Sequence, residues 1–586
     1  MDRRTLLALL LTAIVIVSTP IIFPSRRAPV SDTGFAADTA AVASPVAPST
    51  APPPVGPGTT LERSAAAAAP TQVVAALVPE TTVVRSLTTD SRQRSVYRFV
   101  SPGGVPAVVQ LPEYRSLRPG APSEMTVNLL ESGDQLLRLR LISSGDTIAL
   151  DTIAFRAAPA SRDGNDVVQT FASASGTTPI TLSYRIPADS FVAHLSGNVG
   201  GVGAGRDWRL LVQLPRRIRS EEAKTDEDVR SLAVSYKKGV SEVESIWFRD
   251  LDSLVARGDT GAIRWVTERN KYFIVAVIPK APDTLFRAVS MLAGPRAGDQ
   301  ATAANVVALL PTDSGRFGLT IYAGPQAWEH LKVTAADLEN VNPYGGWLQG
   351  MVQPFATIVM RMLLWMRSTF NVSYGWVLVI FGVAVRLLLW PLNQNAMRSS
   401  LRMQRIQPQL AELQKKFKDQ PEKQREAMLK LYQEHGMSPF TPVLGCLPML
   451  LPMPILFALY FVFQNTIELR GVSFLWLPDL SLRDPYFITP LFMGLSMFLL
   501  SWIGMRGMPP SPQAKMMAYV MPVMLTALFW NFASGLNLYY AVQNVAALPQ
   551  QWLLSRERSA QAKSAPAPAP KPAATSSPQK IPSKRR

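Results

Sequence analysis

A single arginine, Arg386, lies inside an apolar stretch of the sequence that contains no other charged residue. The stretch runs from about Tyr374 to Pro391 and is long enough to cross most of a bilayer. A charge at membrane depth costs on the order of a few kcal/mol, and such residues usually face a bundle interior or a watery cavity. The later apolar runs contain no Asp or Glu that could pair with it. Arg386 is therefore a candidate functional residue, and the alternative is that it snorkels to the lipid headgroups.

Four polar residues of the last apolar run fall on one face of the predicted helix. Asn537, Tyr540, Asn544 and Gln551 are separated by three, four and seven residues, which places them on the same side. A polar face on a spanning helix must find partners within the bundle or line water. We therefore expect a hydrophilic substrate groove formed by Arg386, Asn537, Tyr540 and Asn544. The alternative is hydrogen bonding between helices without any substrate.

Methionines are concentrated in the second half of the chain, where 18 of the 21 follow residue 350. Methionine is flexible and polarisable, and surfaces rich in it accept many apolar partners. Pro448, Pro452 and Pro454 would kink the second apolar run and open a seam beside it. These features predict an adaptable apolar slide for a substrate, with ordinary core and lipid contact as the alternative. We assign the slide to Met449, Met453, Met517, Met521 and Met524.

Five apolar runs in the second half would hold these side chains. With an apolar run near the N-terminus they predict six transmembrane helices, five of which form a core over residues 371–555. Lysine and arginine collect in cytoplasmic loops. Residues 393–441 carry nine of them and the tail after Leu554 carries eight, whereas residues 466–484 carry two. Both chain ends are therefore expected in the cytoplasm. The five runs cover about 374–391, 443–464, 486–505, 518–531 and 536–554.

The N-terminal segment has three predicted parts. Residues 1–23 read as a transmembrane anchor, with cleavage as a signal peptide as the alternative. Residues 24–72 are rich in Pro, Ala, Ser and Thr, which predicts a disordered linker. Residues 73–341 show short runs with period-2 alternation, such as Ile180–Ile186, separated by turn residues. They predict a large exported all-β sandwich domain, closed by a helical patch near residues 335–340.

Three further segments surround the core. Residues 348–368 read as an amphipathic helix lying on the outer membrane surface, with a plain packing helix as the alternative. Residues 393–441 predict a cytoplasmic helical hairpin, because apolar residues there recur at spacings of three and four. Residues 556–586 form a basic, disordered tail that could touch lipid headgroups or ribosomal RNA, or merely solvate the chain end. The hairpin's candidate contact residues are Arg402, Arg405, Lys415 and Lys416.

Composition argues against several classes of function. The three histidines are scattered and Cys446 is the lone cysteine, so neither a metal cluster nor an internal disulfide is expected. No Walker-type loop, GxSxG elbow or HExxH motif occurs. We therefore predict no catalytic residues, no cofactor and no enzyme activity. The formal net charge of +17 suits contact with anionic lipid or nucleic acid.

Several short motifs resemble those of the YidC/Oxa/Alb membrane protein insertases, in the form found in Gram-negative bacteria. The match is strongest over residues 370–556, while the anchor, exported β domain and interfacial helix extend it over nearly the whole chain. The motifs are Val385-Arg386, Trp390-Pro391-Leu392, Gln407-Pro408, Pro439 to Pro448, Pro452-Met453-Pro454-Ile455, Asp484-Pro485-Tyr486, Met521-Pro522, Ser534-Gly535-Leu536 and Tyr539-Tyr540.

The resemblance implies an insertase and chaperone of the bacterial inner membrane. Its hydrophilic groove, closed on the outer side, would carry Arg386 and receive the extracellular part of a nascent span. The span would leave along the third and fifth transmembrane helices, with Tyr540 and Met453 as contacts. The hairpin would recruit the substrate or the ribosome, and the exported domain would be a β-supersandwich similar to sugar-binding folds. Some relatives have Thr one turn before the arginine where this chain has Gly382.

The sequence therefore predicts a monomeric insertase that handles nascent membrane proteins in the lipid bilayer, alone or with the Sec translocon. Two rivals remain from other classes. A secondary transporter or anion channel could use Arg386 as its binding charge, although no internal repeat is found. A carbohydrate-binding envelope protein would leave the basic hairpin and the intramembrane arginine unexplained.

Overall fold

The computed structural model describes residues 81–391 apart from short gaps, parts of 394–420, and residues 421–434, 452–506 and 512–564. The gaps are 88–92, 144–145, 175–177, 202–206, 242, 281–284, 313–314 and 343–348. All described residues belong to the compact unit Val74–Arg586. The predicted anchor and linker lie outside the described residues, as do most of the hairpin and the end of the basic tail.

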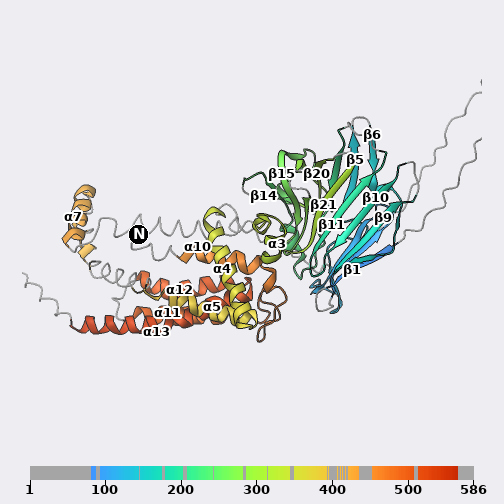
Figure 1. Cartoon of the computed structure of the whole chain (residues 1–586). Helices are drawn as coiled ribbons and strands as arrows, with labels where there is room; N and C mark the ends of the chain where they lie inside the picture. The colour runs from blue at the N-terminus through green and yellow to red at the C-terminus, as the bar shows by residue number, and fades with distance from the viewer. Residues whose placement is uncertain are drawn as a thin grey trace, which may run out of the picture. The chain divides into compact units, whose positions relative to one another are not determined.

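The first half of the described chain is a β domain (Figure 1). Its alternating runs form strands because one face of each is buried, as in β10, where Ile180, Leu182, Tyr184 and Ile186 face the core. The strands are β1 Thr81–Leu87, β2 Gln93–Val100, β3 Val105–Arg115, β4 Thr126–Asn128, β5 Arg138–Ser143, β6 Asp146–Ala149, β7 Phe155–Ala157, β8 Ser161–Asp163, β9 Asp166–Ser173, β10 Ile180–Ile186, β11 Val192–Val199, β12 Arg209–Gln213, β13 Ala233–Lys238, β14 Val243–Trp247, β15 Arg257–Arg269, β16 Phe273–Pro279, β17 Phe286–Ala293, β18 Arg296–Ala297, β19 Gln300–Ala301, β20 Ala304–Pro311 and β21 Arg316–Pro325.

The strands form two main sheets and a small hairpin. A four-stranded sheet has the order β1-β2-β3-β4, and a 15-stranded sheet follows the path β6-β5-β12-β20-β17-β15-β16-β21-β11-β10-β9-β7. Phe99 of the small sheet packs on Phe171 and Tyr184 of the large one, with ring centroids 5.0 and 4.8 Å apart. The two sheets therefore share one core, as in a sandwich.

Short helices complete the β domain. They are η1 Leu150–Thr152, α2 Thr225–Arg230, η2 Phe248–Asp250, α3 Trp328–Thr334 and η3 Leu338–Asn340. Of the helical patch expected near residues 335–340, the structure has the single turn η3, and the longer helix α3 ends just before the patch begins. The indole of Trp265 donates to the carbonyl of Ala336 at 3.0 Å, which holds this segment against β15.

The second half of the described chain is helical (Figure 1). Helix α13 packs against α11 and α5, α12 packs against α11, and α4 packs against α10. Phe381 of α5 and Phe463 of α10 both meet Tyr539 of α13 in a second apolar core, at ring distances of 5.7 and 6.1 Å. The elements are α4 Gln349–Phe370, α5 Tyr374–Leu388, α7 Pro421–Glu434, α10 Pro452–Asn465, η5 Ile467–Leu469, α11 Ile488–Met505, α12 Pro512–Phe529 and α13 Ser534–Ser564.

Each of the five expected apolar runs contains a helix among the described residues. Among the described residues, Ile488–Met505 alone is long and apolar enough to cross a membrane as a single helix. Helices α4 and α5 meet that criterion as a pair bent by 117°, and Ala518–Phe529 is a shorter apolar helix. The α13 helix continues past the expected end at residue 554 as far as Ser564.

Candidate functional site

Arg386 lies in the last turn of α5 and is half-buried. Its Nη2 donates to the side-chain oxygen of Gln550 on α13 at 2.9 Å. Gln550 is 2% exposed, and its own amide nitrogen donates to the carbonyl of Trp390 at 3.1 Å. One buried glutamine therefore holds the guanidinium and the end of α5 at the same time. We call Arg386, Gln550 and Trp390 the arginine relay.

The guanidinium retains unused donor capacity. Arginine has five N–H groups in a rigid fork, and Gln550 accepts from one nitrogen of Arg386. The Nε atom of Arg386 is buried without a hydrogen-bond partner among the described residues. Such a group can bind an incoming carbonyl or carboxylate oxygen, and a buried donor gains more from that bond than an exposed one.

The polar residues predicted to surround Arg386 make other contacts. Asn537, which is fully buried, donates to the carbonyl of Phe529 at 3.2 Å. Asn544 donates to Ser496 Oγ at 3.2 Å and to the carbonyl of Met493 at 3.4 Å, which connects α13 to α11. These two amides act as interhelical hydrogen-bond donors.

Tyr540 also lies away from the arginine relay. Its ring packs on Phe529 and Tyr539 at centroid distances of 5.5 and 5.4 Å, within the aromatic part of the helical core. The contacts of Asn537, Tyr540 and Asn544 in the described part of the chain are thus with α11, α12 and α13, and their roles toward a substrate stay predictions.

Gln550 is the residue that sequence reasoning missed. Neighbouring residues on a helix point about 100° apart, so only one of Gln550 and Gln551 can face α5. The spacing from Asn544 favoured Gln551, whereas the packing of α13 on α5 turns Gln550 inward. A useful signal was the pair of glutamines several turns inside α13, at a depth comparable with that of Arg386 in α5.

Gly382, one turn before Arg386, lies where α5 and α13 approach closely. A Cβ atom at this position would come within 3.2 Å of Val542 Cγ1 and 3.5 Å of the Tyr539 ring. A larger residue would push the two helices apart, because contacts this short require the neighbour to shift. The glycine therefore sets the distance across which Arg386 reaches Gln550.

The predicted apolar slide is described only in part. Met521 and Met524 are half-buried on α12. Met453 lies in α10 and Met517 in α12, but their side chains are outside the described set, as is the whole of Met449. The slide therefore stays a prediction.

Most of the hairpin's basic residues also lie outside the described part. This applies to Arg402, Arg405 and Lys415. The ammonium group of Lys416 lies 5.5 Å from the centre of the Phe417 ring, which is a local contact between neighbours. Within the described part of the chain, no group of three or more His, Cys, Asp or Glu side chains could hold a metal ion.

Comparisons with known proteins cover most of the chain. Residues 365–562 match the family described as "60Kd inner membrane protein", and residues 88–358 match the family described as "YidC periplasmic domain". A protein of Chlorobium luteolum named "Membrane protein insertase YidC" is 31% identical over 74% of this chain and 73% of its own length. One of the same name from Prosthecochloris aestuarii is 30% identical over 65% of this chain and 67% of its own length.

A solved structure was also matched. It is described as an active YidC insertase with the first transmembrane domain resolved, and it is 17% identical over 81% of this chain and 95% of its own. The TM-score of 0.31 is too low to establish a shared arrangement of the parts.

Proposed function

Since the chain belongs to the YidC family of membrane protein insertases, we propose that it inserts membrane proteins by means of the arginine relay. The observation that carries this proposal is the guanidinium of Arg386 inside an apolar helix, held by buried Gln550, with a buried Nε that has no hydrogen-bond partner in the described part of the chain. The relay would bind the polar end of a client segment while that segment is partway across the membrane. The family to which the chain belongs consists of membrane protein insertases and is not a class of catalytic enzymes.

The proposed mechanism is physical and needs no bond chemistry. A hydrophilic segment enters a bilayer at high cost because its polar groups lose water. Hydrogen bonds from the positioned guanidinium replace part of that hydration. Partitioning of the apolar part of the client into lipid then completes the step. A slide along Met449, Met453, Met517, Met521 and Met524 would offer the apolar part an adaptable surface.

We also propose six transmembrane helices with both chain ends in the cytoplasm and the β domain on the periplasmic face of the inner membrane. The basic residues of the hairpin and of the tail support this orientation through the positive-inside rule. The clients would be nascent membrane proteins. The Sec translocon is a proposed partner, and the hairpin and tail are proposed contacts for the ribosome, with the protein acting as a monomer.

The test is insertion of a short single-span precursor into vesicles that hold the purified full chain. Wild type and Arg386→Lys should insert the precursor, because both carry a cation with several N–H donors. Arg386→Ala should insert it at least about tenfold more slowly, as expected when a charge-assisted hydrogen bond is lost.

The control is Arg506→Ala, which removes an arginine whose guanidinium lies 4.0 Å from the centre of the Trp502 ring, just after the end of α11. This variant should insert at the wild-type rate. Equal rates for Arg386→Ala and wild type would reject the relay as the working part, and an inactive wild type would reject the function itself. Solute flux without insertion would favour a transporter instead.

A further inference from the structure

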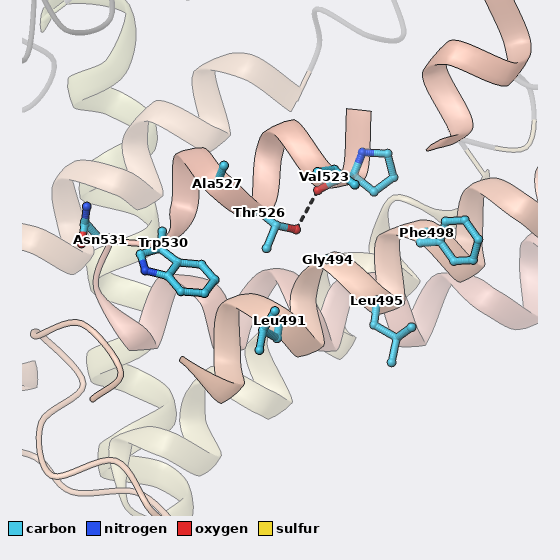
Figure 2. A pocket seen from close by; sticks show the side chains of 10 residues that line it. Leu491, Gly494, Leu495, Phe498, Val523, Thr526, Ala527, Trp530 and Asn531 are labelled. Carbon is cyan, nitrogen blue, oxygen red and sulfur yellow. Dashed lines mark hydrogen bonds between the residues drawn. The ribbon is translucent and has the colours of Figure 1, made fainter. Parts of the chain in front are cut away.

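An apolar groove runs along the surface between α11 and α12 (Figure 2). Its volume is about 610 Å³, within the range of small-molecule sites. The walls come from Leu491, Leu495 and Phe498 on α11, from Val523 on α12, and from Trp530 in the turn that follows α12. We call this the α11/α12 groove. It lies on α11, the helix of the described chain that is by itself long enough to span a membrane.

Two residues, one from each helix, form part of the lining of the groove between α11 and α12. Gly494 permits close packing, because a Cβ atom there would come within 2.0 Å of Thr526 Oγ1. The hydroxyl of Thr526 donates to the carbonyl of Pro522 at 2.6 Å, so it is satisfied within its own helix. The groove therefore presents mostly carbon to whatever fills it.

One end of the groove is polar and carries a positive charge. Trp530 and Asn531 lie together at this end in Figure 2. The exposed side chain of Arg483 donates to Asn531 Oδ1 at 3.5 Å, and its guanidinium lies 5.7 Å from the centre of the Phe487 ring. Phe487 is itself stacked on Trp530 at 4.4 Å, so the cation is held at the mouth of the groove.

The neighbouring carboxylate of Asp484 forms its described hydrogen bonds with groups other than the Arg483 guanidinium. Asp484 accepts hydrogen bonds from the backbone amides of Thr489 and Tyr486 at 2.7 and 2.9 Å, and from the Trp476 indole at 3.2 Å. It caps the start of α11, while Arg483 faces the groove through Asn531. The mouth therefore complements an anion, and the groove behind it complements an alkyl chain.

The length of the groove identifies its occupant. From Leu491 to Phe498 the α11 helix rises about 10 Å, at about 1.5 Å per residue. Phe498 lies at the end of the groove opposite Trp530 and Asn531 in Figure 2, and its ring lies 5.8 Å from that of Tyr519. One leaflet of the hydrocarbon core is about 15 Å thick and a spanning helix needs about 30 Å. A groove of this length matches one acyl chain better than a client helix.

We propose that the α11/α12 groove binds one anionic phospholipid, with an acyl chain along Leu495 and Val523 and the phosphate at Arg483 and Asn531. Indole and amide N–H groups at the headgroup level suit this position. The site requires only that α11 and α12 lie in a bilayer, so it does not depend on the arginine relay.

The test compares two identical substitutions on α12. Val523 and Val520 are both exposed, but only Val523 lines the groove. The full chain is reconstituted in vesicles of equal parts phosphatidylglycerol and phosphatidylcholine, extracted in mild detergent, and its retained lipid is counted by native mass spectrometry. Wild type and Val520→Phe should retain one phosphatidylglycerol per chain. Val523→Phe should retain none, because the added ring fills the groove.

Arg483→Gln tests the charge. It should lower the preference for phosphatidylglycerol over phosphatidylcholine about fivefold, as expected for loss of one cation near a phosphate. Equal lipid retention by Val523→Phe and Val520→Phe would overturn the proposal, as would an unchanged preference in Arg483→Gln. A photoreactive residue at position 495 that captures an inserting precursor instead of lipid would assign the groove to a client helix.

Discussion

Arg386 and Gln550 divide one task between two residues. The arginine supplies the charge, and the buried glutamine fixes its position by accepting from the guanidinium while donating to Trp390. A buried amide that joins the middle of α13 to the end of α5 has few alternative arrangements, because each of its groups already has a partner. Gln550 is therefore a positioning residue for the proposed function.

Substitution of Gln550 separates charge from position. Gln550→Leu removes the acceptor and should slow insertion of a single-span precursor about tenfold. Gln550→Glu keeps an acceptor at the same place but pairs the guanidinium with a carboxylate, so it should be equally slow. Gln543→Leu is the matched control, since Gln543 bonds to Tyr539 on its own helix. Full activity of Gln550→Glu would show that position alone matters.

Glu268 of the β domain is a single residue that makes the folding stability depend on pH. It is fully buried on β15, and this burial, together with the nearby Asp134 carboxylate, raises the pKa of Glu268 well above its usual range. The backbone amide of Ile218 offsets only part of this effect. The folded protein therefore holds a proton that the unfolded chain releases above its ordinary pKa, and stability falls as pH rises above about 4.3.

Glu268→Gln should remove this pH dependence. We expect the variant to be more stable than wild type at pH 7–8 by about 1–3 kcal/mol and close to wild type near pH 4. The measurement is urea unfolding of the full chain in detergent, followed by tryptophan fluorescence. The exposed Glu124 provides the control substitution Glu124→Gln, which should change neither curve. A pH-independent difference for Glu268→Gln would contradict the assignment.

At the scale of elements, the turn η5 after α10 belongs to both cores. Ile467 is part of the apolar core of the β domain, and Leu469 is part of the helical core. Next to them, Arg470 pairs with Glu222 at 2.7 Å and donates to the carbonyls of Arg115 and Glu221. Both charged side chains are buried, so the pair is isolated from screening by salt.

Removal of one partner of the Arg470–Glu222 ion pair should lower the free energy of unfolding. Burial raises the pKa of Glu222 to about 7 although Arg470 opposes the shift, which shows that this carboxylate depends on its partner. We expect Arg470→Met to destabilise the full chain by about 3–5 kcal/mol. The double variant Arg470→Met with Glu222→Leu should recover much of that loss, because no unpaired charge remains. Additive losses in urea unfolding would contradict a coupled pair.

At the scale of the whole molecule, the distribution of lysine and arginine predicts the orientation of the chain. After replacement of Cys446 by serine, single cysteines can report on which side of the membrane each segment lies. Val240→Cys, at a turn of the β domain where the side chain is 93% exposed, should react with an impermeant maleimide in intact cells. Ser577→Cys in the basic tail should react only after permeabilisation. Reaction of both in intact cells would contradict the proposed orientation.

The alternation of Ile180–Ile186 was enough to predict a strand, and the apolar run from Tyr374 was enough to predict α5. Both signals are local, because the period of burial along the chain reveals the repeat of the backbone. The same run singled out Arg386. The family also followed from short motifs, since proline, glycine and arginine positions need no tertiary information to be recognised.

The partners of Arg386 were decided by tertiary structure. Which side of α13 faces α5 depends on how Gly382 lets the helices approach and on how α13 packs on α11. That rotation turns Gln550 toward the guanidinium and leaves Asn544 bonded to Ser496. The helical period of a sequence states which residues share a face. Only the packing against other helices determines which residues that face contacts.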